Sequence, residues 1–263
     1  DAGDKGEKGD KGEKGDKGDK GSKGDKGDKG SKGQATETAP PTAPVALLET
    51  KLETCDDLTA LEGGALLGQL SDGQVSCLGN RLNTSRVQTT KNKISRLLLV
   101  QHEAKGDQAS WEKQMRRHLE EIDRSDPNLC LRYAVHLHKK GLEFEEESIY
   151  WADYALENKQ IWVGDEYVKR VYGLYRLRTE AASKLWIDTE GRYKEVAAGK
   201  GGKDIDKEAE LESLGQQSNE YRGMTKDFAR EWLDYARASG QDYKVALELC
   251  RSASGSDDFC KAK

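Results

Sequence analysis

The chain has 263 residues, of which 43 are Lys or Arg and 48 are Asp or Glu, so its formal net charge is −5. This acidic balance provides no basic face for a phosphate backbone, and we expect no nucleic-acid partner. The longest aliphatic run, Leu97-Leu98-Leu99-Val100, is far shorter than the ~20 apolar residues of a membrane-spanning helix. We therefore expect no membrane span in these residues.

Glycine occupies every third position of residues 1–33 without interruption. Only glycine fits at the shared axis of a collagen triple helix, so this register predicts three chains wound as polyproline-II strands. A disordered spacer in the isolated chain is the alternative, because the tract contains nothing to bury. The axis residues of the predicted triple helix are Gly3, Gly6, Gly9, Gly12, Gly15, Gly18, Gly21, Gly24, Gly27, Gly30 and Gly33.

The same tract contains no proline, and most of its other positions are charged, with ten Lys and nine Asp or Glu. Seven lysines are followed by glycine and then an acid, as in Lys5-Gly6-Glu7, and this spacing can pair opposite charges between staggered chains. The tract resembles the collagen-like stalks of bacterial surface and secreted proteins. The resemblance implies a homotrimer that is extracellular or displayed at the cell surface. We also expect a targeting segment, with or without a lipid anchor, upstream of residue 1.

Three prolines, Pro40, Pro41 and Pro44, lie among Thr and Ala in residues 34–46 and predict a semi-rigid linker. Beyond it, apolar residues recur at helical spacing almost to the end of the chain, which predicts an all-α head. We divide the head into N-terminal helical hairpins, residues 47–106, and a second helical region, residues 107–263.

The first apolar stripe of the head consists of Val45, Leu48, Leu52 and Cys55. It fits either a short trimeric coiled coil or a first helix that packs on its own head. The same helical phase continues through the apolar residues that follow, after which Ser71 or Asp72 is a suitable cap for the next helix. Those apolar residues are Leu58, Leu61, Ala65 and Leu66.

Later helix boundaries are marked more strongly. A helix that contains Ile94 is expected to end near Gly106-Asp107, and Asp126-Pro127 is a strong helix start because it places an acid at the cap and proline at the first helical position. Two helices with small residues at their expected contact follow. Their residues are Ala134, Leu137 and Gly141 in the first, then Ser148, Ala152, Ala155 and Leu156 in the second.

This spacing resembles the helical hairpin of tetratricopeptide repeats. A second, weaker likeness consists of Trp232, Tyr235 and Ala236, the turn Gly240-Gln241-Asp242-Tyr243, and Ala246-Leu247. The sequence departs from the family because the first hairpin has two extra residues between its helices and lacks the usual proline after the second. The resemblance spans about residues 120–250 and implies stacked helical hairpins, with an irregular helical bundle as the alternative.

Five cysteines are present, without a CxxC pair or a His/Cys cluster at zinc spacing, so we expect no metal and no cofactor. In an exported chain the pairings of shortest sequence separation are Cys55–Cys77 and Cys250–Cys260. Cys130 lies in the apolar phase of a helix and is predicted to be a buried free thiol. The alternative is that all five are reduced in a cytosolic protein.

No catalytic arrangement is evident, and we expect no enzymatic activity. His136 and His138 would point to different faces of a helix, and Glu145-Glu146-Glu147 are expected to be solvated or to act as first-turn acids. Six central aromatic residues belong either to the core or to a groove for a peptide partner. These candidates are Trp151, Tyr154, Trp162, Tyr167, Tyr172 and Tyr175.

The leading hypothesis is thus a trimeric stalk that displays α-helical heads, each of which binds a protein or peptide partner. The alternative is a structural subunit of an extracellular filament or cell-envelope assembly.

Overall fold

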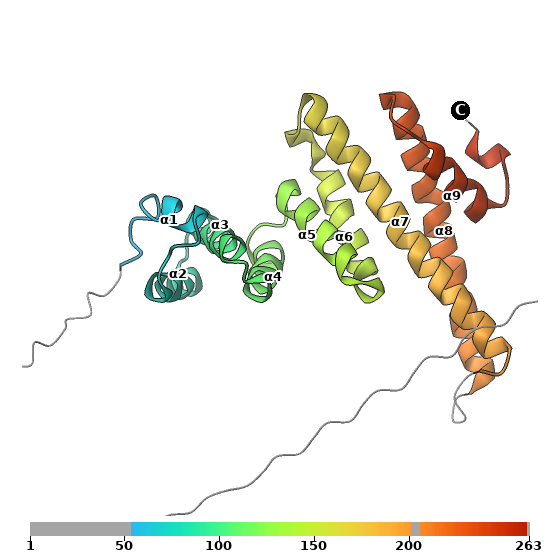
Figure 1. The fold of residues 1–263 in the computed structure, drawn as a ribbon, viewed down its shortest axis with the longest axis horizontal. Coiled ribbons are helices and arrows are strands. Elements are labelled where there is room, and N and C mark those ends of the chain that lie inside the picture. Colours follow the sequence, from blue (N-terminus) through green and yellow to red (C-terminus); the bar gives the residue numbers. More distant parts are fainter. Residues whose placement is uncertain (1–53, 201–205, 262–263) are drawn as a thin grey trace, which may run out of the picture. The chain divides into compact units, whose positions relative to one another are not determined.

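The computed structural model describes residues 54–200 and 206–261 of the chain. Every regular element in these two ranges is a helix, which confirms the all-α prediction for this part of the head. From α5 onward, neighbouring helices pack side by side (Figure 1). The α-helices are α1 (Glu62–Leu66), α2 (Asp72–Thr84), α3 (Gln88–Lys105), α4 (Gln108–Arg117), α5 (Pro127–Lys140), α6 (Glu145–Glu157), α7 (Gly164–Ala197), α8 (Lys207–Ser239) and α9 (Lys244–Ser254). Within the same two ranges, four short helical turns connect or follow them: η1 (His118–Ile122), η2 (Leu142–Phe144), η3 (Lys159–Ile161) and η4 (Asp258–Cys260).

Several predictions concern residues outside the described ranges. The tract 1–33, the linker 34–46 and the first residues of the 47–106 region are among them, so the triple helix, the trimer and the coiled coil stay predictions. The division of the head at residue 106 stays a prediction as well, although α3 ends at the residue before it.

Local chemistry sets the helix ends that the sequence marks most clearly. The Ser71 hydroxyl accepts the backbone N–H of Gln74, whose side chain accepts the Ser71 N–H in return, so α2 begins with a complete capping box. At the start of α5 the Asp126 carboxylate accepts two backbone N–H groups, and Pro127 occupies the first turn. Helix α3 ends at Gly106, where φ is 71°, a left-handed conformation that glycine adopts without a steric cost.

The segment before α1 is not helical, which corrects the helical phase expected there. Residues 54–57 have no regular secondary structure and residues 58–61 form a turn, so the first helix of the described residues begins only at Glu62. The Asp57 carboxylate accepts the backbone N–H groups of Thr59 and Ala60 at 3.0 and 3.1 Å, which satisfies these donors without a helix. Leu58 and Leu61 are nevertheless buried. Their spacing therefore reflects burial of a turn rather than the face of a helix.

The N-terminal core joins this turn to α1, α2 and α3. Leu78 and Leu82 of α2 and Ile94 of α3 are fully enclosed at its centre. Cys55 and Cys77 lie at disulfide distance, with an S–S separation of 2.10 Å, so the bond attaches the irregular segment to α2. Because Cys55 precedes α1, the bond joins an irregular segment to a helix and does not join two helices.

The central core lies between α4, α5, α6 and α7. Tyr133 and Trp151 are buried in it, and small residues allow α5 and α6 to approach closely. The Ser148 hydroxyl donates a hydrogen bond to the backbone oxygen of Ala134 at 2.9 Å, which links the two helices directly. The small residues predicted at this helix contact therefore lie there in the structure.

Helices α7 and α8 are 34 and 33 residues long and pack along each other as a hairpin. Ala181 and Ala182 of α7 are fully buried, while Arg178 makes ion pairs with Asp153 of α6 and Glu231 of α8. No helix in residues 54–200 or 206–261 combines the length and the apolar content needed to cross a membrane.

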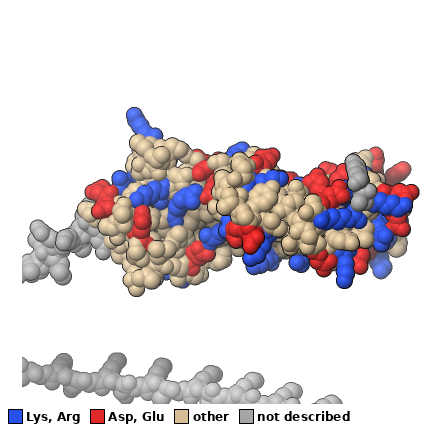
Figure 2. Space-filling view, turned by 90° about the horizontal axis from the view of Figure 1, so that it is seen from above, with Lys and Arg blue, Asp and Glu red and all other residues tan. Residues whose placement is uncertain are grey.

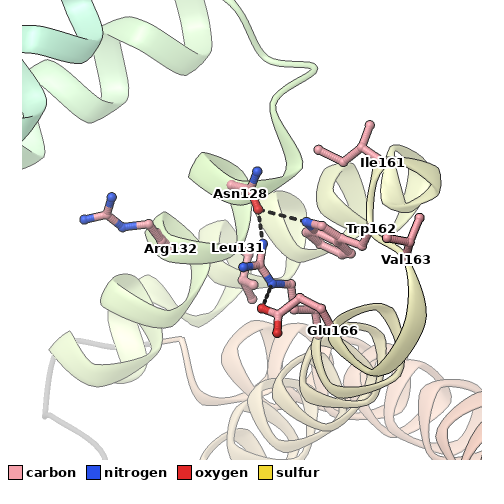
Figure 3. Close-up of a pocket in the computed structure, with 8 residues that line it drawn as sticks. Asn128, Leu131, Arg132, Ile161, Trp162, Val163 and Glu166 are labelled. Carbon is pink, nitrogen blue, oxygen red and sulfur yellow. Dashed lines mark hydrogen bonds and ion pairs between the residues drawn. The ribbon is translucent and has the colours of Figure 1, made fainter.

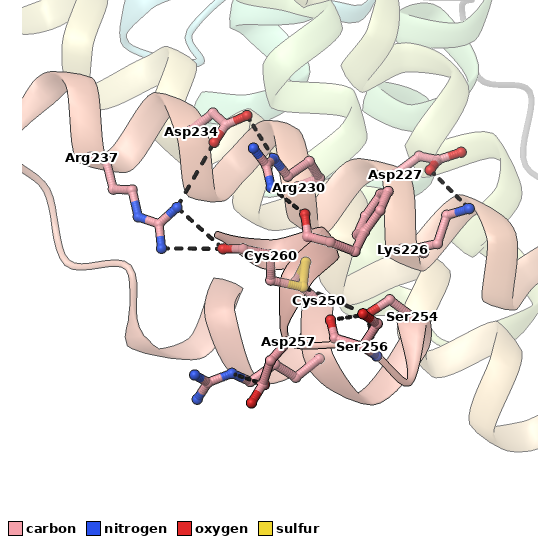
Figure 4. The surroundings of a disulfide bond; sticks show 12 residues. Lys226, Asp227, Arg230, Asp234, Arg237, Cys250, Ser254, Ser256, Asp257 and Cys260 are labelled. Carbon is pink, nitrogen blue, oxygen red and sulfur yellow. Dashed lines mark hydrogen bonds and ion pairs between the residues drawn. A yellow bond between two sulfur atoms is a disulfide. The ribbon is translucent and has the colours of Figure 1, made fainter. Parts of the chain in front are cut away.

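The C-terminal segment folds back onto α8 through backbone carbonyls. Arg222 donates to the oxygen of Ala253 at 2.8 Å, while Arg230 and Arg237 donate to carbonyl oxygens of η4 (Figure 4). A disulfide between Cys250 and Cys260, with an S–S distance of 2.04 Å, also joins α9 to η4.

Candidate functional site

The residues of helix α5 lie on two opposite faces. The buried face packs into the central core through Leu129, Cys130, Tyr133, Ala134 and Leu137. The opposite face borders two adjacent hollows. We call it the open face of α5, and it consists of Asn128, Leu131, Arg132, Val135, His136 and Lys139.

The first hollow has a volume of about 510 Å³ and lies between α5 and the segment that joins α6 to α7. Asn128 anchors it (Figure 3): its side-chain oxygen accepts the indole N–H of Trp162 at 2.8 Å and a guanidinium N–H of Arg170. The Arg170 guanidinium also lies 5.3 Å from the centre of the Trp162 ring. Trp162 is thereby fixed as a wall of the hollow.

Two β-branched side chains next to this wall are unusually exposed. Ile161 and Val163 are 56% and 78% accessible to solvent, and both line the first hollow. In Figure 3 they lie across the hollow from α5, opposite Leu131. Exposed apolar side chains gathered around a concavity are typical of a surface that binds a partner.

The second hollow has a volume of about 560 Å³ and continues from the first, since Leu131 and Arg132 line both. Its far side is formed by Trp111 of α4 and by residues around the end of α3. Arg132 pairs with Glu103 and lies 6.0 Å from the centre of the Trp111 ring. The two hollows are therefore adjacent, and we refer to them together as the depression along α5.

Charged side chains hold the edge of the second hollow in place. Glu112 accepts from Lys140 at 2.7 Å and from His136 at 3.1 Å. Burial acts to raise the pKa of Glu112, but these two hydrogen bonds outweigh it, and the pKa lies below its usual value. Burial lowers the pKa of His102, which favours its neutral form. On the face shown in Figure 2, basic and acidic side chains are interspersed.

The aromatic residues predicted from the sequence do not form one groove. Trp151 is only 2% exposed in the central core, whereas Trp162, also buried, forms a wall of the first hollow. Tyr154, Tyr167 and Tyr175 are half-buried against the central core. The remaining member, Tyr172, packs against the C-terminal core and donates its hydroxyl to the backbone oxygen of Asp242 at 2.8 Å.

The open face of α5 was not predicted. Its residues recur along residues 127–140 at helical spacing, with Leu131 and Val135 as apolar members among polar ones. Such a stripe is hard to distinguish in the sequence from an ordinary solvated face. The flanking residues Ile161 and Val163 carry no helical pattern, and only the fold brings them to α5.

Glu145, Glu146 and Glu147 are in the first turn of α6, as one of the two alternatives held, but Glu145 is not solvated. Its side chain is fully buried, whereas Glu146 beside it is exposed. Lys184 of α7 and His138 of α5 each lie 2.6 Å from one of its carboxylate oxygens. This cluster connects three helices.

A further polar group lies inside the N-terminal half of the described head. The Ser95 hydroxyl accepts from the Gln114 amide at 2.6 Å and lies 2.9 Å from Nδ1 of His118. Burial, followed by the charge of Arg96, lowers the pKa of His118. Ser95 and His118 are fully enclosed and line neither hollow, so their role is structural.

The remaining predicted residues have clear places. The cysteines of the two favoured pairings lie at disulfide distance, and Cys130 is a buried free thiol. The glycines of the predicted trimer axis, Gly3 to Gly33, lie outside the described residues. Within the described ranges, no group of three or more His, Cys, Asp or Glu side chains is placed to hold a metal ion.

Comparisons with known proteins give no identification: no family model, no curated protein and no solved structure matches this chain.

Proposed function

We propose that this chain is a non-enzymatic, exported protein whose head binds a short peptide segment of a protein partner along the open face of α5. The observation that carries the proposal is the pair of adjacent hollows along α5, the first of which is lined by Leu131 on one side and by the exposed β-branched residues Ile161 and Val163 on the other. Apolar contacts there supply affinity, and fixed polar groups such as Asn128 supply orientation.

The dimensions of the open face suit a short extended segment. From Asn128 to Lys139 the helix rises ~16 Å, which matches about five residues of extended chain. The walls at both ends of this length, Trp162 and Trp111, are held by hydrogen bonds or packing before any partner arrives. A surface that is already organised costs less conformational entropy on binding.

The collagen-like tract supplies the second part of the proposal. Three chains joined through residues 1–33 would present three heads, and a target that carries several copies of the segment would be held by more than one head. In this proposal the α5–α6 and α8–α9 hairpins serve as tetratricopeptide-like units. The two disulfide-distance cysteine pairs support an extracellular location, because such bonds persist in oxidising compartments.

Selection of a peptide-display library on the full chain tests the binding part. We expect enrichment of segments that contain apolar residues and that compete with one another for one site. A library that shows no enrichment over an uncoated surface would contradict the proposal.

Sedimentation of the full chain at low temperature tests the trimer. We expect a mass three times that of one chain, while a monomer at every concentration would contradict this part. Assemblies whose length grows with concentration would favour the filament alternative.

A further inference from the structure

A third hollow lies away from α5, between the far parts of α7 and α8, and has a volume of about 500 Å³. Helix α7 contributes Trp186, Glu190, Tyr193 and Lys194, which recur at helical spacing on one face. Unlike the depression along α5, this hollow is lined by no aliphatic side chain among the residues described, so its apolar surface is aromatic.

The two aromatic rings are spaced along one face of α7; Tyr193 is exposed and Trp186 is partly buried. Trp186 and Tyr193 are seven residues apart, so they lie about 10 Å from each other along α7. Opposite Tyr193, α8 carries Gly215, where a Cβ would stand 3.6 Å from the tyrosine ring, and glycine leaves that space free. Tyr193 is 38% exposed.

Polar groups around the rings have unused hydrogen-bonding capacity. The side chains of Tyr193, Ser218 and Asn219 line the hollow, and none of them is hydrogen-bonded to another residue of the described ranges. Arg222 is fixed instead: it donates to the oxygen of Ala253 at 2.8 Å and lies 5.8 Å from the centre of the Trp186 ring. Hydroxyl and amide groups can both donate and accept.

This combination matches the two surfaces of a sugar ring. The C–H groups of a pyranose are weakly positive and pack on the negative face of an aromatic ring. Its hydroxyl groups lie around the edge and need neighbours that both donate and accept, as Ser218 and Asn219 do. An aliphatic peptide side chain or a lipid tail would leave these polar groups without partners.

We propose that the hollow between α7 and α8 binds a saccharide, with Trp186 and Tyr193 stacking on sugar rings and Ser218, Asn219 and Arg222 contacting hydroxyl groups. The spacing of the two aromatic residues fits more than one sugar unit. This site is separate from the open face of α5 and does not depend on the peptide proposal.

An array of defined mono- to tetrasaccharides, both neutral and anionic, tests the site with the full chain and its disulfides intact. We expect native protein to bind a group of related glycans. Trp186→Ala should weaken that binding by at least about tenfold, a change that corresponds to about 1.4 kcal/mol. Asn219→Ala should weaken it as well, and because Asn219 is exposed on α8 this variant should keep the native fold.

Ile187→Ala provides the matched control, since Ile187 is the neighbouring α7 residue, is 63% exposed and does not line the hollow. It should bind glycans as the native chain does, and circular dichroism should show unchanged helix content in all variants. Native protein that binds no glycan on the array, or that loses nothing when both Trp186 and Asn219 are replaced, would overturn the proposal.

Discussion

The carboxylate of Glu145 accepts a hydrogen bond from the ammonium of Lys184 at 2.6 Å, and this contact joins the start of α6 to the middle of α7. His138 of α5 lies 2.6 Å from the other carboxylate oxygen. Glu145 is fully enclosed, whereas the Lys184 side chain is about half exposed. The buried charge is therefore satisfied by two neighbours from other helices, which fixes how the three helices meet.

Replacing Lys184 by methionine should destabilise the head by about 1–3 kcal/mol, because the Glu145 carboxylate then remains buried with a single partner. Urea unfolding, monitored by circular dichroism, measures the change in the free energy of unfolding. Lys194→Met is the matched control. Lys194 forms an exposed pair with Glu190 on the same helix, and its loss should cost no more than about 0.5 kcal/mol. Equal losses in the two variants would contradict the role given to Glu145.

Val163→Asp should abolish peptide binding at the open face of α5 and leave stability within about 0.5 kcal/mol of native, since the side chain is exposed. A charge there would have to be desolvated beneath an apolar partner residue. Fluorescence anisotropy with a peptide selected on the native chain provides the measurement. Val245→Asp, at an exposed valine of α9, should bind as native. Binding lost equally in both variants would place the peptide elsewhere.

Stability should fall as pH drops below about 6.5, partly because of His118. Its pKa is lowered in the folded head, so just below the unfolded value the unfolded chain binds more protons than the folded one. The slope from one such group is at most about 1.4 kcal/mol per pH unit. His118→Asn should lower stability at pH 7.5 and reduce this slope when urea unfolding is repeated at pH 6.5 and 5.5. An unchanged slope would mean that other groups dominate.

The variant that combines Cys250→Ser with Cys260→Ser should lose about 3 kcal/mol, from the greater freedom of the unfolded chain. Unfolding with and without reductant checks this, because Cys55–Cys77 is reduced in both chains and the native chain and the double variant should then have the same stability. Arg222, Arg230 and Arg237 still hold the C-terminal segment, so helix content should be retained at low urea. A double variant as stable as the oxidised native chain would contradict the prediction.

Helix ends were predictable where a few neighbouring residues determine them. Asp126-Pro127 supplies both cap and first turn, Ser71 caps α2, and Gly106 ends α3, all through bonds to adjacent backbone groups. The favoured cysteine pairs were also local, separated by 22 and 10 residues. These features depend on short stretches of chain and need no knowledge of the fold.

Features that depend on distant contacts were missed. The sequence placed Glu145 in a first turn but gave no sign of its burial, because its partner Lys184 is 39 residues away. Leu58 and Leu61 looked helical because burial of a turn produced the same spacing as a helix face. The depression along α5 escaped notice since Ile161 and Val163 reach it from a connecting segment whose path the apolar pattern does not reveal.

Cys130 affects how the chain reaches its oxidised form. Burial, with lesser effects from Asp126 and Asp123, raises the pKa of its thiol to about 12, and the sulfur donates to the backbone oxygen of Arg124. Since only a thiolate attacks a disulfide, the folded head keeps its odd cysteine out of thiol exchange. Early packing of α5 would therefore protect the other four cysteines from mispairing and keep neighbouring chains from becoming cross-linked through sulfur.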